Sequence, residues 1–277
     1  MTSSKNDFSN LCIVTDLDGT LLDDEQRISR KSERAIKEFQ ENGGIFTFAT
    51  GRVQTSITSF IDQLNIQYPV ITHNGAQIFC PRTKRILYRQ SFALTDSIAA
   101  TLATLAKLEN IEIMYFMNEE IYTNEKGPLI QIFEAKEELT VFEQIPTLQN
   151  EYVTKIIIAH TNQALLTAIE QQINAEYPAI CTTFSEPEYL ELLPTNTSKG
   201  NALTFLKNNY LDPARQVITF GNNLNDIPLV SEADIGIAVL NAHPELKRVS
   251  TFVLEKTNQE DAIADYLEKL QLTKVMA

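Results

Sequence analysis

The chain has 277 residues, of which 43% are hydrophobic and 21% are charged. This is the composition of a globular protein rather than of a disordered or fibrous one. Its 23 Lys and Arg face 36 Asp and Glu, a net charge of −13, which disfavours a broad nucleic-acid or membrane surface. A small phosphorylated ligand remains compatible with this charge, because a metal ion or a few local cations can reverse the field inside a cleft.

The sequence carries no pattern of a membrane span or a secretory leader. No run reaches the roughly 18 apolar residues of a membrane helix, and the first ten residues, MTSSKNDFSN, contain no apolar segment. Cys12, Cys80 and Cys181 are too scattered for a disulfide framework or a zinc site. We expect a cytoplasmic protein with free thiols.

Both ends of the chain alternate between strand and helix patterns. Unbroken apolar runs predict strands at 11–15, 45–49, 69–72, 217–220, 235–239 and 251–254. Amphipathic segments between them predict helices, the first of them capped by Ser29 and ended by Gly43 and Gly44. Continuously apolar strands separated by helices are typical of a parallel sheet covered on both faces.

The middle of the chain has a different pattern. Helices are expected around 94–108 and 165–173, with apolar strand runs at 111–117, 121–123, 155–159, 179–184 and 189–193. We therefore predict an α/β protein with one doubly wound, Rossmann-like parallel sheet, formed by residues 1–79 and 195–277. An α+β cap of residues 80–194 interrupts it.

Polar residues follow several of the predicted core strands. They include Asp16, Asp18, Thr50, Asn74 and the loop from Asn222 to Asp226. In open parallel sheets ligands bind at the carboxyl ends of the strands, so these side chains can converge. Lys199, at the start of a helix, can enter the same crevice.

The segment VTDLDGT places two carboxylates two residues apart at a strand end. Asp16 suits a nucleophile that attacks phosphorus, and Asp18 suits an acid that protonates the departing oxygen and later takes a proton from water. Two carboxylates and a phosphate dianion repel one another, so a hard, oxygen-seeking Mg²⁺ ion is the expected cofactor. The alternative, that the pair only solvates a strand end, would require the neighbouring motifs to coincide by accident.

Four segments together resemble the signature motifs of the haloacid dehalogenase (HAD) superfamily. They are DLDGTLL at 16–22, ATGR at 49–52, SKG at 198–200 and GNNLND at 221–226. The order of the motifs and the position of the insert are similar to the Cof-type branch, which has a large α/β cap. The resemblance spans nearly the whole chain and implies a HAD core with an inserted cap.

The resemblance implies a role for each matching residue. Asp16 would become the aspartyl phosphate and Asp18 would be the general acid and base. The phosphoryl oxygens would be held by Leu17, Thr50, Gly51, Lys199 and Asn225. The metal would be held by the Asp16 carboxylate, the Asp18 backbone carbonyl, Asn222 and, in support, Asp226.

One position departs from the family pattern. The fourth motif usually begins Gly-Asp, whereas this chain has Gly221 and Asn222. An asparagine keeps a carbonyl oxygen but lacks the negative charge, so we expect weaker metal binding. Weak catalysis is one consequence to be tested.

Some residues support two interpretations. Asn74, followed by Gly75, is either a turn residue or a substrate contact, and Arg52 is either structural or a cation that faces the ligand. The run Glu134 to Glu138 is expected to form a solvated face of the cap. The residues from Met114 to Met117 are expected in the core of the cap.

The leading hypothesis from the sequence is a Mg²⁺-dependent phosphatase of small phosphorylated metabolites, sugar phosphates above all. A sugar phosphomutase using the same nucleophile is one alternative. A phosphate-binding protein with decayed catalysis, suggested by Asn222, is the other. No nucleic-acid or membrane partner is expected.

Overall fold

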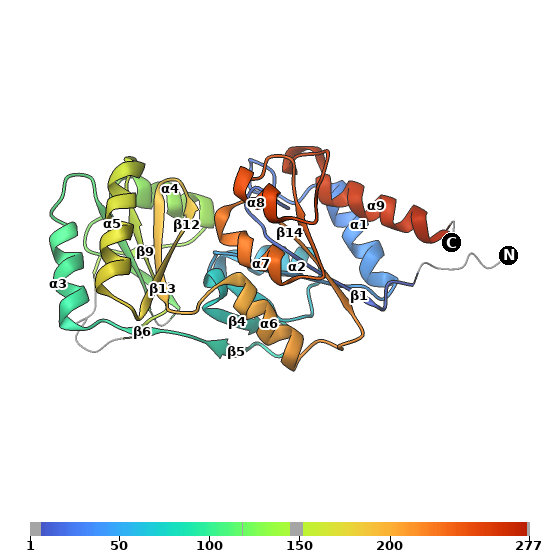
Figure 1. Cartoon of the computed structure of the whole chain (residues 1–277), viewed down its shortest axis with the longest axis horizontal. Coiled ribbons are helices and arrows are strands. Elements are labelled where there is room, and N and C mark those ends of the chain that lie inside the picture. Colours follow the sequence, from blue (N-terminus) through green and yellow to red (C-terminus); the bar gives the residue numbers. More distant parts are fainter. Residues whose placement is uncertain (1–6, 118, 145–151, 276–277) are drawn as a thin grey trace.

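One half of the molecule is built from the two ends of the chain (Figure 1). The structure is a computed structural model, which describes residues 7–117, 119–144 and 152–275. The strands of this half are β1 (Leu11–Thr15), β2 (Ile45–Phe48), β3 (Val70–Thr72), β4 (Gln77–Cys80), β5 (Arg85–Arg89), β14 (Gln216–Gly221), β15 (Ile235–Ala238) and β16 (Phe252–Val253). Its helices are α1 (Arg30–Glu41), α2 (Thr58–Gln63), α6 (Lys199–Asn209), α7 (Ile227–Glu232), α8 (Pro244–Val249) and α9 (Ala262–Val275).

Five of these strands form a parallel sheet in the order β16-β15-β14-β1-β2. Strand β1 pairs with β14 on one side and with β2 on the other, so the two ends of the chain meet in one sheet. A parallel bridge between Ala49 and Ile71 continues the sheet towards β3. The order of the strands confirms the doubly wound α/β core.

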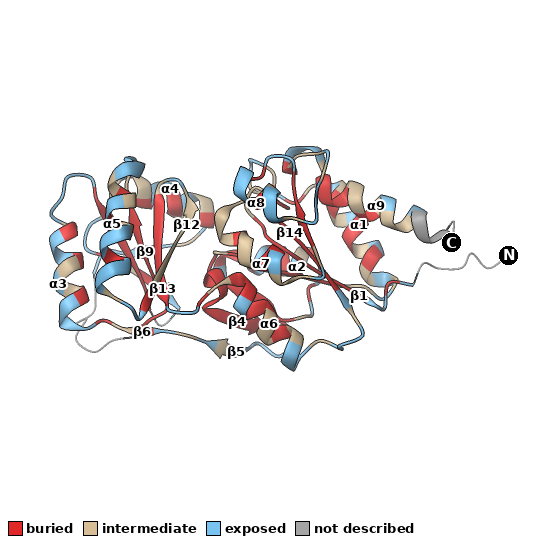
Figure 2. Ribbon diagram, viewed as in Figure 1, coloured by how far each residue is buried: buried red, intermediate tan, exposed pale blue. Residues whose placement is uncertain are grey.

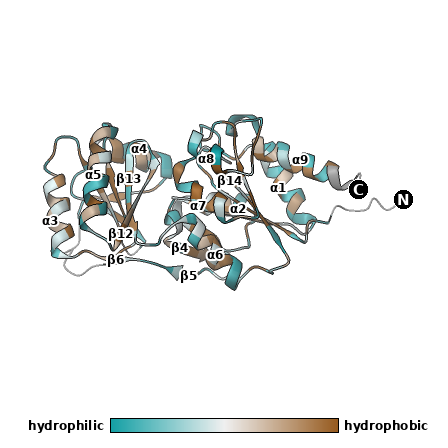
Figure 3. Ribbon diagram, in the orientation of Figure 1, coloured by the Kyte–Doolittle hydropathy of each residue, from teal (hydrophilic) through white to brown (hydrophobic). Residues whose placement is uncertain are grey.

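Helices cover both faces of this sheet, and β1 shows the reason. Leu11 and Ile13 pack in a cluster with α1, α2 and α9. The alternate residues Cys12 and Val14 pack against α6 and α7 on the other face. Figure 2 shows β1 and β14 as buried while the outer faces of the helices are exposed, and Figure 3 shows the matching hydropathy. A strand buried on both faces must be apolar throughout, which explains the unbroken runs in the sequence.

Helix α1 illustrates the local determinants. The Ser29 hydroxyl accepts a hydrogen bond of 3.0 Å from the Ser32 amide, and so caps the first turn. Ala35, Ile36 and Phe39 lie on one stripe and are buried. Burying a side chain such as Phe39 contributes roughly 2–3 kcal/mol, so this stripe docks the helix on the sheet.

Strands β3, β4 and β5 form an antiparallel meander at the edge of the core. The boundary predicted after residue 79 falls inside β4. Residues up to Arg89 pair with core strands because Gln77 in β4 lies opposite Arg89 in β5. We therefore propose that the inserted domain begins near residue 90.

The other half of the molecule is the insert. Its strands are β6 (Phe92–Ala93), β7 (Glu112–Met117), β8 (Glu120–Thr123), β9 (Val141–Phe142), β10 (Tyr152–Val153), β11 (Lys155–Ala159), β12 (Ile180–Glu186) and β13 (Tyr189–Pro194). Its helices are α3 (Asp96–Leu105), α4 (Pro128–Glu137) and α5 (Gln163–Glu176). Six strands form a sheet in the order β12-β13-β11-β7-β8-β9, in which only the β8–β9 pair is parallel.

Side chains of β7 point alternately to the two faces of this second sheet and are packed on both. Tyr115 and Met117 contact the cluster formed with α3 and α5. Met114 and Phe116 lie in the cluster on the other face, with α4 and with Val53 from the core. The predicted placement of Met114 to Met117 in the core of the cap is confirmed.

The chain passes between the two halves twice, and the two passages lie side by side (Figure 1). One follows β5 and the other follows β13. The Thr197 hydroxyl donates a hydrogen bond of 2.6 Å to the Gln90 side-chain oxygen, which joins the two passages. None of the helices in the described segments has both the length and the apolar composition that a membrane span requires.

Candidate active site

A cavity of about 230 Å³ lies where the carboxyl ends of the core strands face the cap. Asp16, Asp18, Gly51, Asn222 and Asn225 line it from the core. The cap contributes Phe133, Lys136, Glu137, Lys155, Ser185, Glu186, Tyr189 and Glu191. The cavity therefore joins residues predicted from the strand ends to cap residues for which the sequence predicted no role in a site.

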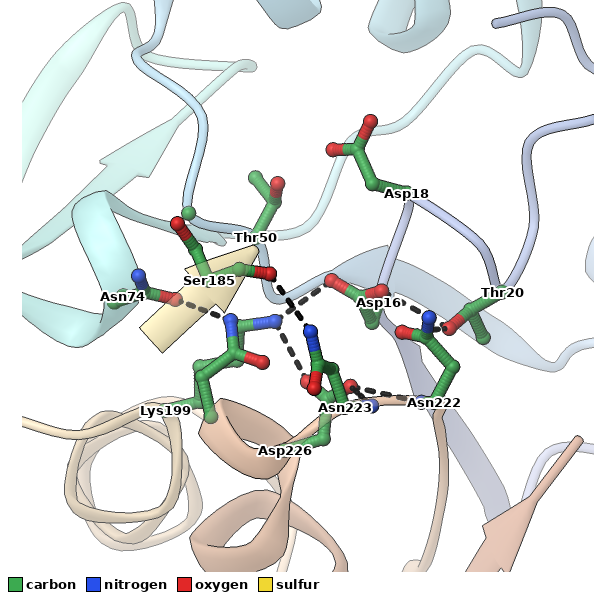
Figure 4. Close-up of polar contacts among 12 residues, drawn as sticks. Asp16, Asp18, Thr20, Thr50, Asn74, Ser185, Lys199, Asn222, Asn223 and Asp226 are labelled. Atoms are coloured by element: carbon green, nitrogen blue, oxygen red, sulfur yellow. Dashed lines mark hydrogen bonds and ion pairs between the residues drawn. The ribbon is translucent and has the colours of Figure 1, made fainter. Parts of the chain in front are cut away.

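Lys199 lies between two carboxylates at the floor of the site (Figure 4). Its Nζ is 2.7 Å from Asp16 Oδ1 and 2.6 Å from Asp226 Oδ1, and all three side chains are buried. Although burial alone would lower it, the two carboxylates raise the pKa of Lys199 above its usual value. The lysine is thus a fixed positive charge beside the expected nucleophile.

Asp16 lies where a negative charge is costly. Burial, and then the nearby charge of Asp226, raise its pKa to about 7, against the opposing effect of Lys199. A second positive charge, supplied by a bound cation, would favour its ionised form.

Asp226 organises the loop that precedes α7. Its Oδ1 accepts a hydrogen bond from Lys199. Its Oδ2 accepts hydrogen bonds from the backbone amides of Asn222 at 2.9 Å and Asn223 at 3.1 Å. The loop is therefore tied to the same carboxylate that holds the lysine.

Thr20 joins Asp16 to Asn222. Its hydroxyl lies 2.9 Å from Asp16 Oδ2 and 3.1 Å from Asn222 Oδ1. Gly19 is required beside them, because its φ is +71° and a Cβ would lie 2.4 Å from Asn222 Nδ2. Thr20 was not predicted as a site residue, although it stands in the DLDGT segment, four residues after Asp16.

Asp18 is held by cations from both halves of the molecule. Arg52 places Nε 2.9 Å from Asp18 Oδ2 and Nη2 2.7 Å from Oδ1. Lys136 of α4 lies 3.4 Å from the same Oδ1. Burial acts to raise the pKa of Asp18, but the hydrogen bonds and charges of Arg52 and Lys136 lower it to about 2. Asp18 is therefore ionised in this arrangement.

The run Glu134 to Glu138 is only in part the solvated face that the sequence predicted, since Ala135 and Glu138 are exposed but Lys136 and Glu137 are not. Glu137 is buried, accepts a hydrogen bond of 2.6 Å from the Ser56 hydroxyl and lies 3.6 Å from Arg52. Lys136 bridges Asp18 and Glu186. The end of α4 packs against the core, so its charges find partners there instead of water.

The remaining predicted phosphate ligands lie around the same strand ends. Thr50 is buried and its hydroxyl accepts the Arg52 amide at 3.1 Å. The Leu17 carbonyl accepts the amides of the turn that follows it, and its side chain is in the core. The Gly51 carbonyl accepts a hydrogen bond of 2.9 Å from Lys155.

Asn74 and Asn225 lie next to each other below the cap. The amide nitrogen of Asn225 donates to Asn74 Oδ1 at 3.0 Å, and Asn74 donates to Glu191 at 2.7 Å. Asn74 also has a left-handed backbone, with φ of 53°. It is thus a turn residue that is hydrogen-bonded to two residues of the cavity wall, Asn225 and Glu191.

The oxygens near Asp16 have the chemistry that Mg²⁺ prefers. Within the described segments no three His, Cys, Asp or Glu side chains form a metal cluster by themselves. The implied set is of another kind, namely one carboxylate (Asp16), one backbone carbonyl (Asp18) and one amide oxygen (Asn222). Asp16 and Asn222 already converge on Thr20, and such oxygen ligands fit a hard cation.

Known proteins are similar to this chain over most of their length. The family model of haloacid dehalogenase-like hydrolases matches residues 13–267. The chain belongs to this family. The 5-amino-6-(5-phospho-D-ribitylamino)uracil phosphatase of Bacillus subtilis is 29% identical, with 94% of this chain and 97% of the relative covered. The HMP-PP phosphatase of Serratia proteamaculans is 27% identical, with 91% and 92% covered.

The fold of the family agrees as well. A haloacid dehalogenase-like hydrolase from Bacteroides thetaiotaomicron superposes with a TM-score of 0.80 at 25% identity, covering 94% of this chain and 99% of its own. The chain is therefore a Cof-type HAD phosphatase, a phosphoric monoester hydrolase, as the four motifs indicated.

Proposed function

We propose that this HAD phosphatase hydrolyses small, hydroxyl-rich phosphorylated metabolites, with Mg²⁺ as cofactor and an aspartyl phosphate on Asp16 as intermediate. The observation that carries the proposal is the contact of Lys199 with Asp16 and Asp226 inside the cavity. A buried lysine beside a nucleophilic carboxylate offsets the repulsion between that carboxylate and a phosphate dianion.

The reaction has two steps. An Asp16 oxygen attacks phosphorus, the bond from phosphorus to the ester oxygen breaks, and Asp18 gives its proton to that oxygen. Water then attacks the aspartyl phosphate, Asp18 takes a proton from it, and the bond between Asp16 and phosphorus breaks to release inorganic phosphate.

The ionised Asp18 of this structure suits the second step. The first step requires a protonated Asp18, so its contacts with Arg52 and Lys136 must give way when substrate enters. The leaving group would then lie between Asp18 and the cap.

Bound Mg²⁺ would neutralise part of the negative charge on the phosphoryl oxygens. Asp16, the Asp18 carbonyl and Asn222 would hold the ion, and Asp226 would support it by fixing the loop of Asn222. Thr50, with the backbone of Leu17 and Gly51, and Asn225 would donate hydrogen bonds to the phosphoryl oxygens.

The cap side of the cavity supports a polar leaving group. Glu186 offers carboxylate oxygens, which accept hydrogen bonds from hydroxyls, with Lys136 beside it, and the buried Glu137 and Glu191 add negative charge to the wall. The volume of about 230 Å³ is below the roughly 300–1,000 Å³ of pockets for drug-sized ligands. A phosphorylated sugar or polyol fits this description, and the Bacillus subtilis relative is named for a phosphorylated ribityl substrate.

The test is a hydrolysis screen across phosphorylated sugars, polyols, nucleotides and acids, with and without Mg²⁺. Asp16→Asn should abolish turnover, because an amide cannot form the aspartyl phosphate. Asp18→Asn should lower turnover by roughly 10²–10⁴-fold. Asp24→Asn is the matched control, since Asp24 is exposed in the same segment and should leave activity unchanged.

Retention of Mg²⁺-dependent hydrolysis by pure Asp16→Asn protein would refute the assignment of the nucleophile. Transfer of the phosphoryl group to an added sugar rather than to water would instead indicate a phosphomutase.

A further inference from the structure

Two charged residues of the cap lie buried side by side on neighbouring strands. Lys155 begins β11, Glu191 is in β13, and each is 2% exposed. Lys155 Nζ is 3.3 Å from the Glu191 carboxylate and also lies 4.5 Å from the centre of the Phe116 ring. In the sequence Lys155 begins the apolar run KIIIA, and Glu191 interrupts the apolar run YLELLP.

This pair reaches across into the loops of the core. Lys155 donates to the Gly51 carbonyl at 2.9 Å, and Glu191 Oε2 accepts from Asn74 Nδ2 at 2.7 Å. Asn74 Oδ1 then accepts from Asn225 Nδ2 at 3.0 Å. A carboxylate of the cap is thus connected through one amide to Asn225.

The carboxylate fixes the direction of this chain of hydrogen bonds. Ionised Glu191 only accepts, so Asn74 must turn its NH₂ group towards the cap and its oxygen towards Asn225. Asn225 must then anchor its own NH₂ group at Asn74, which leaves one of its two N–H bonds for another acceptor. Among the described residues, the Asn225 oxygen has no partner.

We propose that Glu191 is a positioning residue of the phosphate site, which acts through Asn74 to present an N–H group of Asn225 to the phosphoryl oxygens. This role rests on the proposed function, in which Asn225 contacts phosphate. Lys155 neutralises Glu191 and ties the Gly51 loop to the same strand pair.

A glutamine at position 191 should reverse the donor–acceptor direction of these hydrogen bonds. Glu191 has two acceptor oxygens, one for Lys155 and one for Asn74, whereas glutamine has a single oxygen. Hydrogen bonds to a charged donor are the stronger ones, so the glutamine oxygen should turn to Lys155 and its NH₂ group to Asn74. Asn74 and Asn225 would then flip, and Asn225 would present an oxygen to the phosphate.

The experiment is calorimetric titration with inorganic phosphate in the presence of Mg²⁺, which needs no turnover. Glu191→Gln should weaken phosphate binding by about tenfold or more, the scale of one hydrogen bond to a charged group. Thermal unfolding of the same protein reports separately on its stability. Glu188→Gln, on the turn between β12 and β13, removes the same charge and should bind phosphate as the unaltered protein does.

A second substitution tests the mechanism of the effect. In Lys155→Met with Glu191→Gln no cation competes for the glutamine oxygen, which can again accept from Asn74. This double variant is electrically neutral at the pair and should bind phosphate more tightly than Glu191→Gln alone.

The outcomes separate the two proposals. Phosphate binding by Glu191→Gln within threefold of the unaltered protein, or tighter, would overturn the positioning role while leaving the proposed function intact. A double variant that binds as weakly as Glu191→Gln, or more weakly, would overturn it as well. Absence of phosphate binding by the unaltered protein would overturn both.

Discussion

The guanidinium of Arg52 donates hydrogen bonds to both carboxylate oxygens of Asp18, at 2.9 Å and 2.7 Å. Its side chain is only 3% exposed and also lies 3.6 Å from Glu137 of the cap. One cation therefore satisfies a carboxylate of each half of the molecule. The sequence left Arg52 open between a structural and a ligand-facing role; its contacts are structural, and it also lines the cavity.

Arg52→Met should destabilise the protein. Removing one partner of a buried ion pair costs about 3–5 kcal/mol, because the charge that remains is uncompensated. Denaturant unfolding of the metal-free protein measures this loss. Arg27→Met is the matched control, since Arg27 is 63% exposed in its surface ion pairs and should change stability by less than about 1 kcal/mol. Equal effects of the two substitutions would contradict the buried role of Arg52.

Asn222→Asp should strengthen Mg²⁺ binding, because it restores a carboxylate beside Asp16. The Mg²⁺ concentration for half-maximal activity should fall by about tenfold, while turnover at saturating Mg²⁺ changes less. In the metal-free protein the added charge should lower stability. Asn209→Asp, at the exposed end of α6, controls for net charge. Identical Mg²⁺ titration curves for Asn222→Asp and the unaltered protein would mean that residue 222 is not at the metal.

His73 should make stability depend on pH. Burial, and then the charges of Lys155 and Arg89, lower its pKa from 6.5 to about 3. Between these values the unfolded chain binds a proton that the folded protein excludes, so stability is fully present above pH 6.5 and falls on acidification. The slope from this group approaches about 1.4 kcal/mol per pH unit.

The comparison of His73→Asn with the unaltered protein isolates this effect. Asparagine tolerates the left-handed backbone of residue 73, whose φ is 52°. Unfolding measured from pH 7 to pH 4 should show a shallower loss in His73→Asn. His160→Asn, on a half-buried cap residue, should retain the full slope. The assignment would be contradicted if the slope of stability against pH became shallower in His160→Asn, or if it stayed unchanged in His73→Asn.

Excision of the cap should leave a folded core if the cut lies after the end of β5, so that this strand is kept. Gln90 and Thr197 are hydrogen-bonded, so a short linker from residue 90 to residue 195 spans the gap. The same linker placed after residue 79 removes β5, the partner of β4, and should give a less stable product. Circular dichroism and thermal unfolding of both proteins compare them. Equal stability would favour the boundary at residue 79.

Much of the fold could be predicted from the sequence because periodicity reports burial. Leu11–Thr15 and Lys155–Ala159 are strands because each is apolar enough to be covered on both faces. Ser29 was predicted as the N-cap residue of a helix, and it is the N-cap of α1. Strands β4 and β5 were not predicted, since their apolar runs at 78–80 and 86–88 are short and β5 is largely exposed. The pairing of β4 with β3, and of β5 with β4, moves the proposed boundary of the insert.

The candidate site could be predicted only on its core side. Asp16, Lys199 and Asp226 follow strands or begin helices, so their convergence follows from the topology of a parallel sheet. Lys136, Glu137 and Glu191 depend on how the cap lies against the core, and no local pattern encodes that contact. A charge within an apolar strand, as at Lys155 and Glu191, was the available signal.

The hydrogen bond between Glu191 and Asn74 has a consequence for how such enzymes diversify. Selection for a new substrate acts on the cap, yet a change at position 155 or 191 would also disturb the loops that hold phosphate. Ser185 and Tyr189 line the same cavity without any hydrogen bond to those loops from their side chains among the described residues. Libraries that randomise positions 185 and 189 while keeping 155 and 191 fixed should therefore retain far more active clones than libraries built the other way round.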